Sequence, residues 1–255
     1  MPFRVLRNRD RSGAYLISLC TGTALIGMFF FLTLFVQDVW GYSPLRTAAA
    51  YLPFVPAVLA TTAVTQQGVN RIGPRPLLIT GSAVAAGGMF WASRLTEHST
   101  FAGGMLGPEL LLGAGLGPLF VLIFLIGLIK VATGDTGVAS SLVNVGQQVG
   151  GAIGLAIVGT VAWSAVASNR QSAAAAAAAT QAGAHPSAAQ AAALQAQIYH
   201  HALATGFSRG YLVSAGVLVL SLVIALFMMR VSRADLSGAE PTPEPAGDAS
   251  SPNLA

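Results

Sequence analysis

The sequence predicts an all-α membrane protein of six transmembrane helices, and its composition and long apolar runs support this. Of its 255 residues, 54% are hydrophobic and 9% are charged, and the mean hydropathy is +0.66. A soluble domain carries about 25% charged residues. The apolar runs are continuous, whereas membrane β-strands alternate polar and apolar residues. This pattern favours helices surrounded by lipid.

A helix that crosses the bilayer core of ~30 Å needs about 20 mostly apolar residues. Six runs meet this length, and we expect the spans at 13–37, 47–67, 76–94, 104–129, 137–163 and 207–230. A basic lead-in, 1–12, precedes them. The alanine-rich outer connection 164–206 is expected to form short surface helices, because alanine favours helix while Gly183 and Pro186 interrupt the run. The polar tail 231–255 is expected to be disordered and cytoplasmic.

The basic residues predict the orientation, because lysine and arginine concentrate in cytoplasmic loops. With the N-terminus inside, the inner side receives Arg4, Arg7, Arg9, Arg11, Arg71, Arg75, Lys130, Arg230 and Arg233. The outer side or its border keeps Arg46, Arg94, Arg170 and Arg209. We therefore expect a multi-pass protein of the cell membrane with both ends in the cytoplasm.

Several other classes of function find no support in the sequence. It has no Gly-x-Ser-x-Gly elbow, no His-Glu-x-x-His motif and no pair of intramembrane aspartates, so we expect no enzyme. His185, His200 and His201 have no cysteine or paired carboxylate at metal-ligand spacing, so no metal or cofactor is expected. Cys20 has no second cysteine to pair with. The dispersed arginines lack an aromatic platform, which argues against nucleic-acid binding.

Five stretches together resemble one family. They are "FRVLRNRDRSGAYL", "FFFLTLFVQDVWGYSPLRTAAAYLPFVP", "NRIGPRPLLITG", "GVASSLVNVGQQVGGAIGLAIVGTVA" and "ATGFSRGYLVSA". The chain is similar, over about residues 3–230, to the C-terminal half of a major facilitator superfamily transporter of the fourteen-helix drug:proton antiporter branch. The resemblance implies a half-bundle that takes part in proton-coupled efflux of drugs or other amphipathic or cationic small molecules by alternating access.

Six helices supply one of the two bundles that such a transporter moves against each other. We therefore expect the chain to be inactive in transport without a first-half bundle, or without a second copy of itself in that place. The alternative is a non-transporting membrane subunit, or a truncated relic, that acts only by protein interaction.

The turn between the second and third spans is similar to the family's cytoplasmic gate loop, Gly-x-x-x-Asp-Arg-x-Gly-x-Arg. Arg71, Gly73 and Arg75 match the pattern, whereas Gln66 and Asn70 replace the glycine and the aspartate. Asn70 can hydrogen-bond a helix end but cannot form an ion pair. The resemblance implies a role in gating, and the simpler interpretation is a basic turn that sets topology.

Polar side chains share one stripe of the fifth span. Polar groups inside a membrane are costly unless they face a partner or a wet cavity. At helical spacing, the side chains within about 100° of one another are Ser140, Asn144, Gln147 and Gln148, with Gly151. They are candidates for the substrate pathway. Alternatively, Asn144 and Gln148 only hydrogen-bond neighbouring helices.

Small residues and prolines predict where helices pack closely or bend. In the fifth span, Ala139 and a row of glycines lie on a stripe that permits close approach, namely Gly146, Gly150 and Gly154. In the fourth span, "GAGLGPLF" predicts a packing and kink site at Gly113, Gly117 and Pro118. Pro53 and Pro56 are expected to bend the second span.

Glu109 is the carboxylate that lies clearly inside a predicted span, about four residues or ~6 Å from its outer end. The simpler interpretation is that its side chain reaches interfacial water. The alternative is a proton-coupling site, because an apolar setting favours the protonated carboxyl and suits it to exchange protons near neutral pH.

Overall fold

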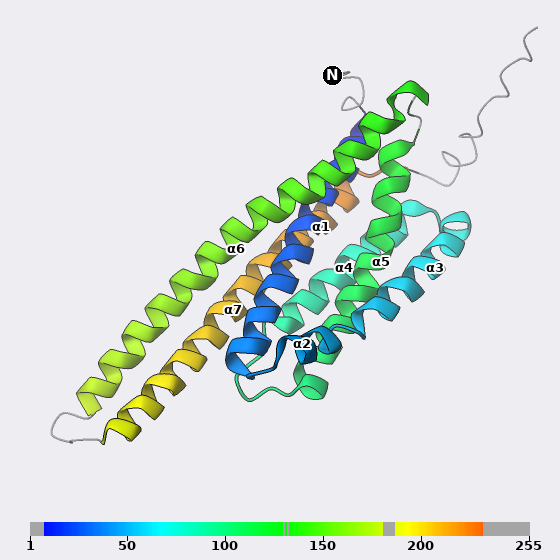
Figure 1. The fold of residues 1–255 in the computed structure, drawn as a ribbon. Helices are drawn as coiled ribbons and strands as arrows, with labels where there is room; N and C mark the ends of the chain where they lie inside the picture. Colours follow the sequence, from blue (N-terminus) through cyan, green and yellow to red (C-terminus); the bar gives the residue numbers. More distant parts are fainter. Residues whose placement is uncertain (1–7, 130, 132, 181–186, 232–255) are drawn as a thin grey trace, which may run out of the picture.

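The computed structural model describes residues 8–129, 131, 133–180 and 187–231, and within these ranges the regular structure is helical throughout (Figure 1). The all-α prediction is confirmed. The elements are α1 (Arg9–Leu34), the π-helical turn η2 (Phe35–Val39), α2 (Pro44–Ala50), α3 (Phe54–Ile72), α4 (Pro74–Ala92), the π-helical turn η3 (Phe101–Met105), α5 (Leu106–Leu128), the 3-10 turn η4 (Thr133–Asp135), α6 (Thr136–Thr180) and α7 (Ala188–Phe227). Most of the basic lead-in (1–7), Gly183, Pro186 and nearly all of the tail (232–255) lie outside the described residues.

Short polar residues, a glycine and a proline determine where several helices begin or end. The Asn8 side chain accepts hydrogen bonds from the backbone N–H groups of the first turn of α1, a typical N-cap. Gly73 separates α3 from α4 with a φ of 90°, a conformation that glycine adopts without strain, and Pro74 follows as the first residue of α4. Ser187 and Gln190 form a capping box at the start of α7.

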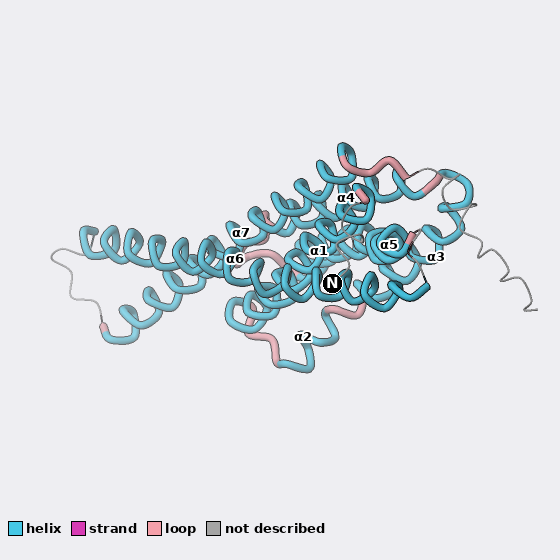
Figure 2. The backbone as a smooth tube through the Cα atoms, turned by 90° about the horizontal axis from the view of Figure 1, so that it is seen from above, coloured by secondary structure: helices cyan, strands magenta, loops and turns pink. Residues whose placement is uncertain are grey.

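The helices form one bundle in which α1 is central. It packs against α5, α6 and α7, while α4 lies between α5 and α7 and α3 lies on the outer side of α5 (Figures 1 and 2). Large buried side chains such as Phe31, Phe35, Met89 and Phe207 fill the interior. The periphery of α3 remains apolar, with Leu59 and Val64 among its exposed side chains, as expected for a helix that faces lipid.

The connection 164–206 is not a set of short surface helices, which corrects the sequence prediction. Its described residues continue α6 and α7, and the two helices form a long hairpin that projects beyond the rest of the bundle (Figures 1 and 2). At 1.5 Å per residue, the 45 residues of α6 extend about 68 Å, more than twice the bilayer core. The consecutive alanines continue the helix, because alanine has the highest helix propensity.

The second predicted span, 47–67, is interrupted. Residues 51–53 form a turn between α2 and α3, and Pro53 is the residue that precedes α3. Proline disfavours helix in the residue before it, which explains a break here instead of the predicted bend within one helix. Pro56 lies in the first turn of α3, where its missing N–H is tolerated.

Five helical segments among the described residues are long and apolar enough to cross a membrane: Arg9–Val39, Pro44–Ile72, Phe101–Leu128, Thr136–Ala178 and Ala189–Phe227. The 19-residue α4 is not among them, although it packs between α5 and α7. The count of six spans therefore stays a prediction.

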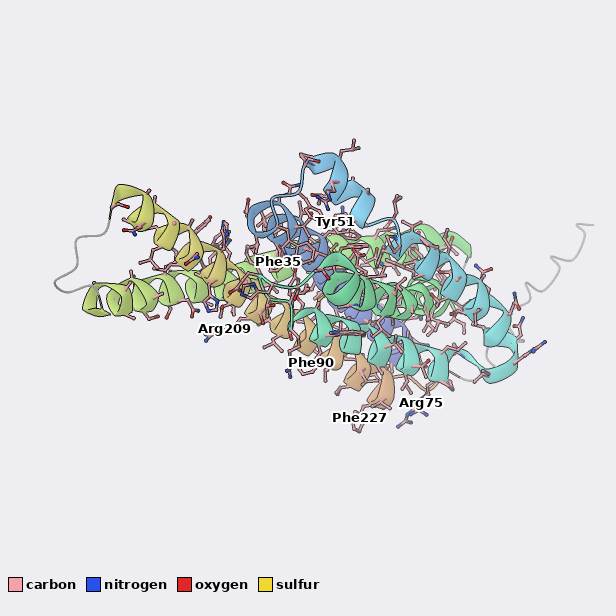
Figure 3. All side chains as sticks on the ribbon, turned by 90° about the horizontal axis from the view of Figure 1, so that it is seen from below. Phe35, Tyr51, Arg75, Phe90, Arg209 and Phe227 are labelled. Atoms are coloured by element: carbon pink, nitrogen blue, oxygen red, sulfur yellow. The ribbon has the colours of Figure 1, made fainter. Side chains whose placement is uncertain are left out.

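The two ends of the bundle differ in chemistry. At one end, called the arginine end below, Arg9 and Arg75 lie beside the last turn of α7, and Figure 3 shows Arg75 near Phe227. The opposite end, called the hairpin end, holds the α6–α7 projection and the connection between α4 and η3.

Candidate functional site

Glu109 lies inside the bundle, away from the surface. Its side chain is 1% exposed, and neither carboxyl oxygen has a hydrogen-bond partner among the described residues. An ionised carboxylate without a partner is very costly in such surroundings. The arrangement therefore suits the neutral, protonated carboxyl in this conformation.

Glu109 lies deeper inside its helical segment than the sequence predicts. The π-helical turn η3 extends the helix outward from α5, so Glu109 lies eight residues, or about 12 Å, inside the segment Phe101–Leu128. Leu95 of the connection 93–100 and Met105 of η3 are both buried and line a small cavity together with Glu109. The side chain therefore does not reach interfacial water in this structure.

Tyr211 shares the cavity with Glu109, and the sequence analysis missed it. Tyr211 comes from α7, is 1% exposed, and its hydroxyl has no partner in the described part of the chain. The cavity is small, about 10 Å³, and the remainder of its wall is apolar. A tyrosine hydroxyl inside a predicted span is the pattern that would have drawn attention to this residue.

The polar stripe of α6 lies largely on the outside of this bundle. Asn144 and Gln148 are exposed, and Ser140 is partly buried. The Asn144 amide donates to the Ser140 carbonyl at 3.2 Å, within its own helix, and Gln148 has no hydrogen bond among the described side chains. The buried amide nitrogen of Gln147 has no partner in the described residues either. Among the described residues, the stripe thus makes no polar contact with a neighbouring helix.

The glycine stripe of α6 lies against α1. A methyl group at Gly146, Gly150 or Gly154 would collide with residues 15–23 of α1, and at Gly150 it would meet the Leu19 backbone. Thr23 donates to the Gly150 carbonyl at 2.7 Å across the same contact. Two backbones in direct contact are typical of small residues at membrane helix crossings.

The glycines and proline of α5 lie against α3 and α4. A methyl group at Gly113 would come within 3.0 Å of the Phe54 carbonyl oxygen, and one at Gly117 within 2.8 Å of the Val58 carbonyl oxygen. Pro118 lies inside α5 and faces Gly81 of α4. These close contacts fix the position of α5 relative to α3 and α4, and thereby the position of Glu109 on α5.

The predicted gate loop lies at the arginine end. Arg75 donates to the Leu226 carbonyl at 2.9 Å, and Arg9 donates to the Phe227 carbonyl at 2.7 Å. These carbonyls belong to the last turn of α7, where a helix leaves its C=O groups without intrahelical partners. Asn70 and Arg71 are exposed, and their side chains make no hydrogen bond with a described residue. The loop therefore contacts the C-terminal end of α7, a helix of its own bundle.

The connection 93–100 is fastened to α7 at the hairpin end. The Ser208 hydroxyl donates to the Ser93 carbonyl, and His201 Nδ1 donates to Glu97 Oε1 at 2.9 Å. Burial acts to raise the pKa of Glu97, but the hydrogen bond from His201 and the nearby His201 and His98 outweigh it, so the pKa is lower than that of an ordinary glutamate.

Comparisons with known proteins find resistance, export and transport proteins. No family model matches the chain. It is 29% identical to the puromycin resistance protein pur8 of Streptomyces alboniger, over 93% of this chain and 44% of that protein. It is 38% identical to the cephamycin export protein CmcT of Amycolatopsis lactamdurans, over 58% of this chain and 31% of that protein. It is also 29% identical to the MFS-type transporter EfpA of Mycobacterium tuberculosis, over 63% of this chain and 31% of that protein.

The chain is homologous to major facilitator transporters. It spans from about a third to about a half of the length of these curated relatives. The relatives are named for export, resistance or transport and not for an enzyme activity, which confirms the prediction of a non-enzymatic protein. With five candidate spans, this major facilitator homologue is a multi-pass membrane protein.

Proposed function

We propose that the chain is the second half of a proton-coupled exporter of amphipathic or cationic small molecules, and that it works only with a first-half bundle. The relatives named for puromycin resistance and cephamycin export support the substrate class. Their greater length supports the need for a further bundle. By the positive-inside rule, we place the arginine end in the cytoplasm and the hairpin end outside.

The burial of Glu109 is the observation that carries the proton coupling. The carboxyl has no partner among the described residues, so this conformation favours its protonated form. A conformation that admits water beside it would favour release of the proton. Alternating access supplies such a change of surroundings in every cycle.

The exposed polar stripe of α6 supports a proposal about which face of this bundle meets the first-half bundle. Amide side chains that face lipid would leave their donors and acceptors unbonded. We therefore place Asn144, Gln147 and Gln148, with Ser140, on the face that meets the first-half bundle across a wet substrate pathway. The interior of this bundle offers them no partner in the described residues.

The gate loop has a proposed role at the arginine end. Arg75 contacts the end of α7, so movement of the α3–α4 turn would be transmitted to the helix that carries Tyr211. Arg71 and Asn70 are left free to meet the first-half bundle.

The test measures accumulation of a fluorescent cationic dye in cells. The chain is expressed alone, and together with the part of the puromycin resistance protein that it does not match. We expect lower dye accumulation only in the pair, and a dependence on external pH that Glu109→Gln abolishes. Asp38→Asn, which removes an exposed carboxylate, is the matched control and should leave the pH dependence intact. No effect of the pair on dye accumulation would refute export, and an unchanged pH dependence in Glu109→Gln would remove Glu109 from the mechanism.

A further inference from the structure

Tyr211 is a buried polar group to which the proposed function gives no task. Leaving a buried hydroxyl without a hydrogen bond destabilises the folded protein. Most buried polar side chains in proteins have a partner, so each exception needs an explanation. Phenylalanine in the same place would fill the same space without this cost. A function that uses the hydroxyl would explain its presence.

Glu109 and Tyr211 line the same cavity from two helices, Glu109 from α5 and Tyr211 from α7. The rest of the wall includes Met28, Leu32, Met89, Leu95, Met105 and Leu112. Since all three oxygen atoms lack a partner among the described residues, the two side chains do not hydrogen-bond each other directly. The cavity of about 10 Å³ is at the lower limit of the space that a single water molecule needs, about 10–15 Å³.

We propose that Tyr211 is a positioning residue for Glu109, and that one water molecule held between them transmits its hydrogen bond to the carboxyl. The inference rests on the proposed role of Glu109 as the proton-exchanging group. Both side chains are buried and unpartnered in the described structure, and the cavity joins them.

A chain of hydrogen bonds through the water can form in both protonation states of Glu109. When the carboxylate is ionised, the water donates one hydrogen to it and accepts the Tyr211 hydroxyl hydrogen. When the carboxyl is protonated, its O–H donates to the water, and the water donates to Tyr211 Oη. The phenol keeps its own proton in both states, so only Glu109 gains or loses charge.

The arrangement also links proton binding to a movement of α7 relative to α5. The water is held well only while the two helices keep their present separation. Loss of the proton strengthens the hydrogen bond between the water and the carboxylate, because charged acceptors form stronger hydrogen bonds. The protonation state of a group on α5 is thereby transmitted to α7, whose far end is held by Arg9 and Arg75.

The test is infrared spectroscopy of the full chain in lipid bilayers. The band lost in Glu109→Gln identifies the C=O stretch of the protonated carboxyl. In Tyr211→Phe, which removes one oxygen atom, we expect this band to move to higher frequency because the carboxyl loses its ordered hydrogen bond. A water O–H band, identified by its shift in H₂¹⁸O, should disappear in both variants.

Ser214→Ala is the matched control. Ser214 lies one turn from Tyr211 on α7, and its buried hydroxyl also has no partner in the described residues, but it does not border the cavity. It should leave both bands in place. A Glu109 band that is unmoved in folded Tyr211→Phe would overturn the positioning role and leave the proton site standing. The absence of any Glu109 carbonyl band in the wild-type chain would overturn the proton site and this inference together.

Discussion

At the scale of single residues, the glycines of α6 determine how closely that helix approaches α1. Gly150 faces the backbone of Leu19, and Gly22 faces the backbone of Gln147, so each helix contributes a position without a side chain. The sequence analysis predicted this stripe from its four-residue spacing. It could not predict the partner helix, because spacing within one helix carries no information about its neighbour.

Gly150→Ala tests the contact. The added methyl group has no space beside Leu19, so we expect a loss of about 1–3 kcal/mol in the free energy of unfolding. Reversible unfolding in mixed detergent micelles measures it. Gly216→Ala, where an added methyl group meets no atom within 4 Å, is the control and should cost nothing. Equal stability of the two variants would show that α6 does not pack on α1 in this way.

Glu109 shows what a sequence can and cannot reveal about a residue. A carboxylate inside an apolar run is visible in the sequence, and it was identified there as a candidate proton site. Its burial was not predicted, because it depends on the turn η3, which includes Met105, and on Leu95, which belongs to the connection before that turn. Tyr211 was not identified from the sequence for a similar reason: it lies 102 residues from Glu109 in the chain and meets it only through long-range packing.

At the scale of helices, the end of α7 is held by side chains from two others. Arg9 and Arg75 donate to the carbonyls of Phe227 and Leu226, and both positive charges also suit the negative end of the helix dipole. The sequence identified Arg75 only through its place in a turn. The contact depends on where α7 ends, and sequence patterns locate helix ends poorly.

Arg75→Gln should loosen the last turn of α7. Charges at a helix end contribute about 0.3–1 kcal/mol, so we expect amide hydrogen exchange near residues 224–229 to accelerate about two- to fivefold. Mass spectrometry of the exchanged peptides measures the change. Arg71→Gln removes an exposed arginine of the same loop whose side chain has no hydrogen bond to a described residue, and should leave exchange unchanged. Equal rates in both variants would argue against this helix cap.

The contact between the 93–100 connection and α7 is expected to depend on pH. The lowered pKa of Glu97 means that the folded protein favours its ionised form. The stabilisation is therefore fully present above the ordinary glutamate pKa of about 4.3 and is lost as the pH falls below that value. Since the Glu97 and His201 side chains are 26% and 63% exposed, the contribution belongs with surface pairs, at about 0.2–1 kcal/mol.

Thermal unfolding of Glu97→Gln in lipid nanodiscs checks this contact. We expect the variant to be less stable than the wild type near pH 7 and equal to it well below pH 4. His98→Gln, which changes a 90% exposed neighbour at 3.8 Å, should have the smaller effect at neutral pH. A difference that grows on acidification would contradict the assigned direction.

At the scale of the whole molecule, composition and run length were enough to predict an all-helical membrane protein. They were not enough to predict the long hairpin of α6 and α7, because alanine-rich sequence is compatible with both a continued helix and short separate ones. The break between α2 and α3 was missed for a related reason: proline in an apolar run can bend a helix or end it.

The central claim is that this bundle, paired with a first-half bundle, exchanges protons for an amphipathic cation through Glu109. The most direct measurement follows internal pH and dye fluorescence together in sealed vesicles that contain both bundles. The account predicts that an imposed pH gradient drives dye against its concentration gradient, that protons move in the opposite direction, and that Glu109→Gln stops the proton movement coupled to the dye. Dye transport that continues in Glu109→Gln with the same accompanying proton flux would contradict it.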